Sequence, residues 1–233
     1  MTAQTIFIEG RPCYVYGEAN AEYLLFQMAD EHELQNMDSE VAAIAQSKHR
    51  FLFAAIPVMN WNDELSPWEA PTVWGKQGFG SNAVDTLHFL TAQVIPTLKQ
   101  QVDFPESIKV ILGGYSLAGL FALWASTQTN LFCGIAAASP SVWFPGWMEF
   151  EQQHPVQAPR VYLSLGDKEE RTKNPVMAAV GDHIRTLHGH LAERGADCTL
   201  EWNSGGHFKN ADLRIARAFQ WVMEKQKGKS HAD

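Results

Sequence analysis

Short apolar runs alternate along the chain with segments whose apolar residues recur at helical spacing. The segment TIFIEGRPCYVYGE predicts two short strands that turn at Gly10 to Pro12. Six further runs predict strands, and their unbroken apolar character predicts burial on both faces. These runs are EYLLFQMAD, RFLFAAIP, IKVIL, FCGIAAAS, RVYLSLG and DCTLEW.

Three segments between the runs predict helices. Asn174 is placed to cap a helix that begins at Pro175 and ends at Gly195. A second helix follows Ser81, and Pro96 must kink or shorten it. A third lies near the C-terminus. The spaced apolar residues are Val176, Val180, Ile184, Leu187 and Leu191 in the first, Leu87, Leu90, Val94 and Leu98 in the second, and Leu213, Ala216, Phe219 and Val222 in the third.

This alternation of strand and helix predicts the α/β class, with a mostly parallel central sheet and helices on both faces. A chain of 233 residues, 45% of them hydrophobic, is long enough for one large core, so we expect a single domain over residues 1–233 with a flexible tail at 227–233. Such sheets carry their chemistry in the loops beyond the carboxyl ends of their strands.

Composition narrows the classes of partner. The 26 acidic and 18 basic side chains give a net charge of −8, the wrong sign for binding nucleic acid. No segment approaches the ~20 apolar residues of a membrane span, and the N-terminus has no leader pattern, so a cytoplasmic protein is expected. Cys13, Cys133 and Cys198 are widely spaced and predict small core residues, without a disulfide framework, metal or cofactor. The oligomeric state is left open.

The stretch GGYSLAGLFALW, residues 113–124, joins an apolar strand to an apolar helix and isolates one hydroxyl, that of Ser116. A nucleophile elbow has this arrangement, since the residues two before and two after its serine must be small for strand and helix to pack closely. Gly114 and Ala118 meet that requirement, with alanine in place of the usual last glycine. The alternative is that Ser116 merely caps the helix.

A serine nucleophile needs a base and an acid. In folds built around a nucleophile elbow, the chain order is serine, then acid, then histidine. His207 stands in NSGGHF directly after the last predicted strand, whereas His190 falls inside a predicted helix and His231 lies in the tail. The strand RVYLSLG is followed by two candidate acids. Glu169, three residues after its glycine, is preferred to Asp167.

The negative oxygen of the tetrahedral intermediate needs two backbone N–H donors. Leu117, directly after the serine, would supply the first. In this fold the second comes from the loop after the third strand, here QMADEHEL. We place it at Ala29, with Met28 as the alternative.

Together GGYSLAGLFALW, NDELSPW, SPSVWF, LSLGDKEE and GGHF resemble the putative-esterase family of α/β hydrolases over about residues 22–222. That family includes S-formylglutathione hydrolases (esterase D), enterochelin esterases, feruloyl esterases and mycolyl transferases. The resemblance implies the α/β-hydrolase fold and a metal-free serine hydrolase that cleaves small-molecule carboxylic or thiol esters. It implies the nucleophile Ser116, the base His207, the acid Glu169 or Asp167, and the oxyanion donors Leu117 and Ala29.

The chain departs from this pattern at Gln27-Met28-Ala29, where relatives often have an acid or histidine followed by glycine. Some members manage without a well-placed acid, so a Ser116–His207 dyad is the alternative to a triad. Two further functions fit the same residues: transfer of the acyl group to an alcohol or thiol, and a non-catalytic binding protein. A peptidase is disfavoured, since nothing suggests the additional domain that usually restricts such sites to peptides.

Aromatic residues gather in two predicted loops at the carboxyl edge of the sheet, where we expect them to wall an acyl or aryl pocket. The segment 143–159 has room for little more than one short helix, which predicts a minimal lid or none and an open site. The aromatic residues are Trp61, Trp68, Trp143, Phe144, Trp147 and Phe150.

Overall fold

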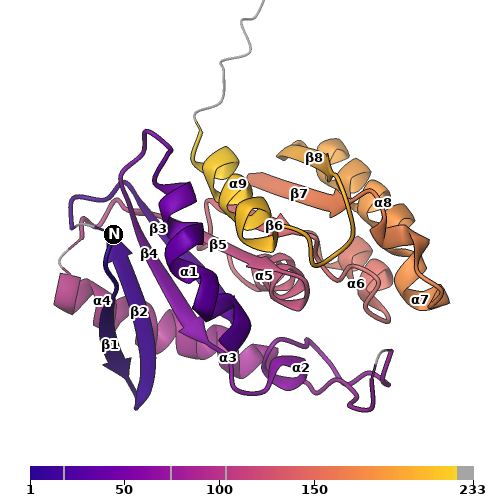
Figure 1. Ribbon diagram of the computed structural model, residues 1–233, viewed down its shortest axis with the longest axis horizontal. Coiled ribbons are helices and arrows are strands. Elements are labelled where there is room, and N and C mark those ends of the chain that lie inside the picture. Colours follow the sequence, from indigo (N-terminus) through magenta and orange to yellow (C-terminus); the bar gives the residue numbers. More distant parts are fainter. Residues whose placement is uncertain (18, 74, 103, 225–233) are drawn as a thin grey trace, which may run out of the picture.

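A computed structural model describes residues 1–17, 19–73, 75–102 and 104–224, and the predicted tail at 227–233 lies outside these ranges. The described residues form an eight-stranded sheet in the order β1-β2-β4-β3-β5-β6-β7-β8 (Figure 1). The strands are β1 (Gln4–Ile8), β2 (Arg11–Gly17), β3 (Tyr23–Ala29), β4 (Phe51–Pro57), β5 (Lys109–Tyr115), β6 (Gly134–Ala138), β7 (Arg160–Gly166) and β8 (Asp197–Asn203). β1 pairs with β2, and β2 with β4, in antiparallel fashion, while all other neighbours are parallel. The predicted strands and the mostly parallel sheet are confirmed.

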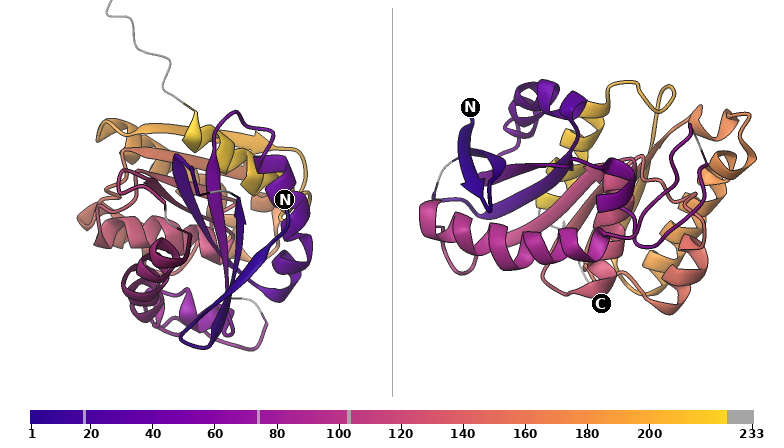
Figure 2. Two further views of the ribbon diagram at one scale, coloured as in Figure 1. Left: turned by 90° about the vertical axis from the view of Figure 1, so that its left-hand side faces the viewer. Right: turned by 90° about the horizontal axis from the view of Figure 1, so that it is seen from below.

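Helices cover both faces of this sheet, as predicted (Figure 2). α1 and α9 pack against each other on one face, and α3, α4, α5 and α8 cover the other. No helix among the described residues is long and apolar enough to cross a membrane. The helices are α1 (Glu31–Ile44), α2 (Trp61–Glu64), α3 (Ala83–Phe89), the π-helical η1 (Leu90–Val94), α4 (Ile95–Val102), α5 (Leu117–Gln128), α6 (Trp147–Gln153), the 3₁₀ turn η2 (Glu169–Arg171), α7 (Pro175–Ala178), α8 (Val180–Glu193) and α9 (Ala211–Met223).

Burial along the strands follows their places in the sheet. β3 and β6 are buried throughout, and β4, β5 and β7 are buried except at one end. The prediction of burial on both faces is wrong for β8, which is half-buried and leaves Trp202 42% exposed. The reason is its position, because β8 is an edge strand with only β7 beside it.

The predicted helix from Pro175 is interrupted. The Asn174 side chain accepts hydrogen bonds from the N–H groups of Val176 and Met177, as a cap does, and Pro175 occupies the first turn. A short helix, α7, ends at Ala178, and α8 begins at Val180, with Ala179 as the cap residue of both. The apolar stripe accordingly starts in α8, and Val176 is 42% exposed instead of buried.

The other two predicted helices are present. The one after Ser81 runs through α3, η1 and α4, and its wide π turn lies directly before Pro96. Proline lacks an N–H and clashes with the preceding turn, and a π turn absorbs that disturbance without ending the helix. In α9 the predicted stripe is shifted: Leu213 is 51% exposed, while Arg214 and Ile215 are buried.

A buried polar pair lies between α1 and the sheet. Gln27 Nε2 of β3 donates to Glu40 Oε2 of α1 at 3.3 Å, and both side chains are fully buried. Gln27 Oε1 and Glu40 Oε1 have no hydrogen-bond partner among the described residues. Burial, and secondly the nearby charge of Glu33, raise the pKa of the Glu40 carboxyl well above its usual value, so this group keeps its proton in the folded protein.

Glu40→Gln should therefore stabilise the fold at neutral pH. Below the pKa of a free glutamate both states hold the proton; above it the unfolded chain ionises while the folded chain cannot, so Glu40 costs more stability as the pH rises. We expect the variant to gain about 1–2 kcal/mol of unfolding free energy at pH 7.5 and almost nothing at pH 4. Urea unfolding at both pH values measures it, and a loss at pH 7.5 would contradict this account.

Candidate active site

Ser116 occupies the one-residue turn between β5 and α5. Its backbone angles are φ 56° and ψ −121°, a conformation that residues with a side chain seldom adopt. Its N–H donates to Ala138 O, and its carbonyl accepts from Leu120 and Ser141, which holds the turn in place. Ser116 is the N-cap residue of α5, but its side chain makes no capping hydrogen bond, so the alternative in which its hydroxyl satisfies the first N–H groups of the helix is wrong.

Small residues on both sides of the turn let strand and helix touch. A Cβ added to Gly114 would lie 2.5 Å from the carbonyl carbon of Ala118 and 2.6 Å from its Cβ. No real side chain fits in that space. The small residues at these two positions are therefore required by the contact between β5 and α5, as the motif predicts.

His207 and Glu169 meet at the carboxyl edge of the sheet. The loop between β8 and α9 returns across this edge (Figure 1), and His207 Nδ1 lies 2.7 Å from Glu169 Oε2. Tyr115, the residue before Ser116, donates from its hydroxyl to His207 O at 2.5 Å, and the two rings lie 5.2 Å apart. The structure thus places the histidine loop against the strand that carries the serine.

The Ser116 hydroxyl has a different neighbour. Its Oγ lies 3.3 Å from Ser141 Oγ, and the described residues form no hydrogen bond between it and His207. Ser141 belongs to the segment after β6, which is the strand beside β5. Hydrogen bonds between nucleophile and base are often long without substrate and tighten when one is bound.

The two candidate acids lie in different surroundings. Glu169 contacts His207, whereas Asp167 Oδ1 accepts from the N–H of Gly205 at 2.7 Å. Gly205 has a φ of 108°, which a glycine adopts without strain, and the loop folds back there as its glycines predict. Asp167 therefore holds the backbone of the histidine loop and makes no hydrogen bond to the imidazole.

The Glu169 carboxylate is buried and fully hydrogen-bonded. Its side chain is 6% exposed, and Oε1 accepts from Gly166 N at 2.7 Å, Ser139 Oγ at 2.8 Å and Arg214 NH1 at 3.1 Å. Burial alone would raise the pKa of this carboxyl. The hydrogen bond to His207 and the charge of His207, together with the hydrogen bonds from Gly166 and Ser139, outweigh burial and lower the pKa of the Glu169 carboxyl below its usual value. Glu169 is thus held as an anion next to His207.

Sequence reasoning missed three residues of this cluster: Tyr115, Ser139 and Arg214. Of these three residues, only Arg214 could have been identified as buried from the sequence. It lies one helical turn before Ala218 and two before Val222, both buried, so helical spacing puts a charged residue on the buried face of α9. Tyr115 and Ser139 lie inside GGYSLAGLFALW and SPSVWF, at positions that the chemistry of these motifs does not require, and Ser139 has a φ of 43° that no local pattern predicts.

The positions considered for the two oxyanion donors lie at the same edge of the sheet. Leu117 is the first residue of α5, where helix N–H groups lack intrahelical partners. Ala29 is the last residue of β3, and Met28 is buried inside that strand. The loop expected after this strand is absent. Asp30 caps α1 directly, in a reciprocal capping box with Glu33 that starts the helix at once.

The aromatic residues of the two loops pack mainly against one another. Phe144 and Trp147 are buried, and the Trp68 ring lies 5.7 Å from that of Phe144 and 5.0 Å from that of Phe150. Trp68 Nε1 also donates to Pro145 O. The short helix α6 occupies the segment at 143–159. Much of this aromatic surface therefore packs α6 against the loop that contains Trp68.

Comparison with known proteins places this arrangement in a family. The model of the family described as Putative esterase matches residues 34–211, well over half of the chain. This chain belongs to that family. Membership makes it a carboxylic ester hydrolase, and the α/β-hydrolase fold expected from the sequence is confirmed by its similarity to solved structures.

Three similar proteins illustrate the breadth of the likeness. Uncharacterized protein YbbA of Bacillus subtilis (strain 168) is 26% identical over 178 residues, which is 71% of this chain and 70% of that protein. An IroE-like serine hydrolase from Shewanella oneidensis has a TM-score of 0.79 at 15% identity, covering 94% of this chain and 79% of its own. Siderophore hydrolase EstB from Aspergillus nidulans has a TM-score of 0.74 at 17% identity, with 97% and 96% covered.

The contact between strand and helix at the elbow predicts that Gly114→Ala destabilises the fold. The new methyl group would overlap Ala118 and force the backbones apart, at a cost of about 1–3 kcal/mol. Gly189→Ala is the control, since Gly189 lies in α8 with nothing within 4 Å of the added Cβ. That variant should gain up to about 1 kcal/mol of helix propensity. Equal unfolding free energies for both variants in urea would contradict the close contact.

Proposed function

We propose that the protein is a serine esterase in which Ser116 is the nucleophile, His207 the general base and Glu169 the acid of the triad. The observation that carries this proposal is the 2.7 Å hydrogen bond between His207 Nδ1 and Glu169 Oε2, at the edge where Ser116 leaves its strand. A proton held on Nδ1 by a carboxylate leaves the lone pair on Nε2, where a base must have it.

The reaction then has two halves. Ser116 Oγ attacks the ester carbonyl while His207 Nε2 takes its proton, and the N–H groups of Leu117 and Ala29 donate to the developing oxyanion. The C–O bond to the alcohol breaks, and the alcohol leaves with the proton from His207. Water next attacks the acyl group on Ser116, gives its proton to His207, and the serine regains that proton as the carboxylic acid departs.

A triad with Glu169 is favoured over both a dyad and a triad with Asp167. A bare dyad leaves the imidazole free to change tautomer, whereas the hydrogen bond to Glu169 fixes it. The lowered pKa of Glu169 keeps the carboxyl charged at neutral pH, so it can stabilise the imidazolium that forms. Asp167 already accepts a backbone N–H of the histidine loop.

The substrate that this site suits is a small-molecule ester. Two proteins of similar fold are described as siderophore hydrolases and another as an enterobactin esterase, and these names support ester substrates of modest size. The segment between β6 and β7, where a lid would be inserted, contains only the short helix α6. We therefore expect an open site that acts on soluble esters. A soluble acetyl ester should be hydrolysed faster than an emulsified long-chain triglyceride.

Ser116→Ala should lower the turnover of p-nitrophenyl acetate by about 10³-fold or more, since the acyl-enzyme cannot form. Ser141→Ala is the matched control. It removes the hydroxyl 3.3 Å from Ser116 Oγ but not the proposed nucleophile, and should keep kcat within about tenfold of the wild type. A Ser116→Ala enzyme that turned over normally would refute the proposal, and a dead Ser141→Ala enzyme with an active Ser116→Ala would move the nucleophile to Ser141.

Glu169→Gln and Asp167→Asn separate the two carboxylates. The first should lower kcat by about 10²- to 10⁴-fold, because the amide can hold the wrong tautomer of His207. The second should lower it by less than about tenfold, because asparagine still offers an oxygen to Gly205 N. Steady-state kinetics at pH 8 measures both, and small, similar losses would favour the dyad over Glu169.

A further inference from the structure

Arg214 of α9 is the buried cation of this site, with 4% of its side chain exposed. Its guanidinium reaches groups from four separate segments: the acid, the histidine loop, the strand before the serine and the segment after β6. NH1 lies 3.1 Å from Glu169 Oε1, 3.1 Å from Tyr115 Oη and 3.4 Å from Ser139 Oγ, and NH2 lies 3.3 Å from Ser204 O and 3.2 Å from Gly206 O.

A buried guanidinium is expensive unless every donor finds a partner. The neighbours of Arg214 on the inner face of α9, Ile215, Ala218 and Phe219, are apolar and satisfy the packing of that helix without it. An apolar residue at this position would remove one of the three donors to Glu169 Oε1 and the side-chain donor that two loop carbonyls share. The arginine therefore serves the groups that it contacts, which are the groups around His207.

We infer that Arg214 is a positioning residue of the reaction: it joins Glu169, the His207 loop and Tyr115 into one rigid unit and limits the negative charge that Glu169 presents to His207. This inference rests on the proposed function. The planar guanidinium suits the task, since its two terminal nitrogens donate in different directions at once.

The position of the Arg214 cation determines in which direction its loss would change the protonation of the His207 imidazole. Glu169 faces His207 from η2, Tyr115 from β5 and Arg214 from α9, while Asp167 is hydrogen-bonded to the loop two residues before the imidazole. Without Arg214, Glu169 keeps its bonds from Gly166 and Ser139 and stays in place with its charge less compensated. A proton on the imidazole is then favoured, so more of the free enzyme is inactive at a given acidic pH.

The test is the pH profile of kcat/KM for p-nitrophenyl acetate in Arg214→Met, Arg214→Lys and Arg217→Met. In Arg214→Met we expect kcat to fall about tenfold or more with KM nearly unchanged, and the acidic limb to move up by about half a pH unit. In Arg214→Lys we expect the acidic limb at its wild-type pH but only a partial recovery of kcat. Lysine supplies the positive charge but lacks the two terminal nitrogens with which the guanidinium donates in different directions.

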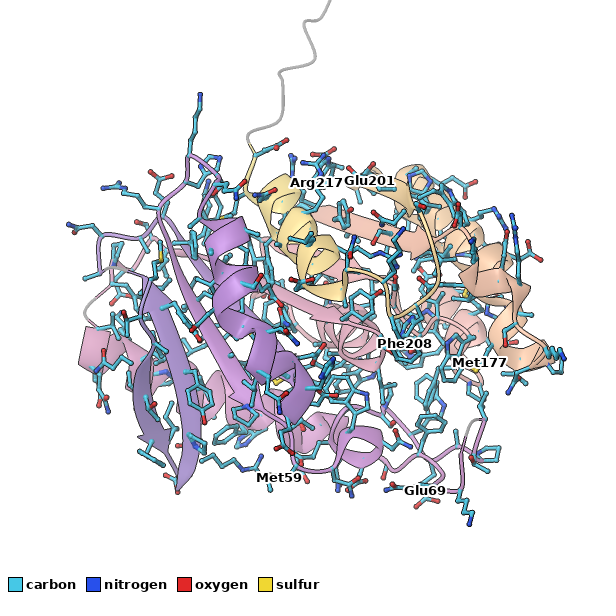
Figure 3. The ribbon with its side chains drawn as sticks, viewed as in Figure 1. Met59, Glu69, Met177, Glu201, Phe208 and Arg217 are labelled. Atoms are coloured by element: carbon cyan, nitrogen blue, oxygen red, sulfur yellow. The ribbon has the colours of Figure 1, made fainter. Side chains whose placement is uncertain are left out.

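Arg217→Met is the matched control one turn further along α9. Arg217 is exposed at the surface, where NH2 donates to Glu201 Oε1 at 2.9 Å (Figure 3), and its loss should leave the profile unchanged. Active sites are titrated with a phosphonate, so that kcat counts only folded enzyme. If Arg214→Met does not fold, Arg214→Gln replaces it with the same expectation.

A lower melting temperature for Arg214→Met with kcat per titrated site and acidic limb both unchanged would overturn the inference and leave a purely structural role. A limb that moved to lower pH would overturn it as well. The proposed function fails separately: if Ser116→Ala is labelled by the phosphonate as the wild type is, the triad is wrong whatever Arg214 does.

Discussion

The contact between β5 and α5 at Gly114 and Ala118 is the constraint on which the rest of this site depends. The two backbones lie so close that the chain must reverse within one residue, and Ser116 takes a left-handed conformation to do so. Such a conformation costs about 1–3 kcal/mol and persists only where its surroundings hold it. Here the surroundings are the backbone hydrogen bonds to Ala138, Leu120 and Ser141. The result is a half-buried hydroxyl at the N-terminus of α5, where the first N–H groups of a helix lack intrahelical partners.

Sheet topology brings the other proposed parts to the same edge of the sheet as that hydroxyl. From β5 to β8 the strands lie side by side in chain order and run parallel, so the segments after each strand leave from the same edge. Ser116, Ser141, Glu169 and His207 each follow one of these strands. A buried anion among them is tolerable only with matched donors, and Glu169 has them in His207, Gly166, Ser139 and Arg214.

How much of the fold and of the site could be predicted depends on how far apart in the sequence the interacting residues lie. The elbow is local, since the five residues from Gly114 to Ala118 determine it, and the motif around Ser116 predicts it from side-chain size alone. The order of the later segments follows from the parallel sheet, which led to His207 and Glu169. Arg214 was not predicted to join this site because its partners come from four separate segments, and no spacing within α9 identifies them. The shift of the α9 stripe and the exposure of β8 likewise depend on neighbours that only the folded sheet provides.

The proposed chemistry requires that Ser116 is the one hydroxyl that becomes acylated. Its most direct test is to treat the wild-type protein with a fluorophosphonate, digest it, and locate the adduct by mass spectrometry. A nucleophilic Ser116 gives one adduct per chain, on the Ser116 side chain itself. An adduct on Ser139 or Ser141 instead, or none on any serine of this edge, would contradict it.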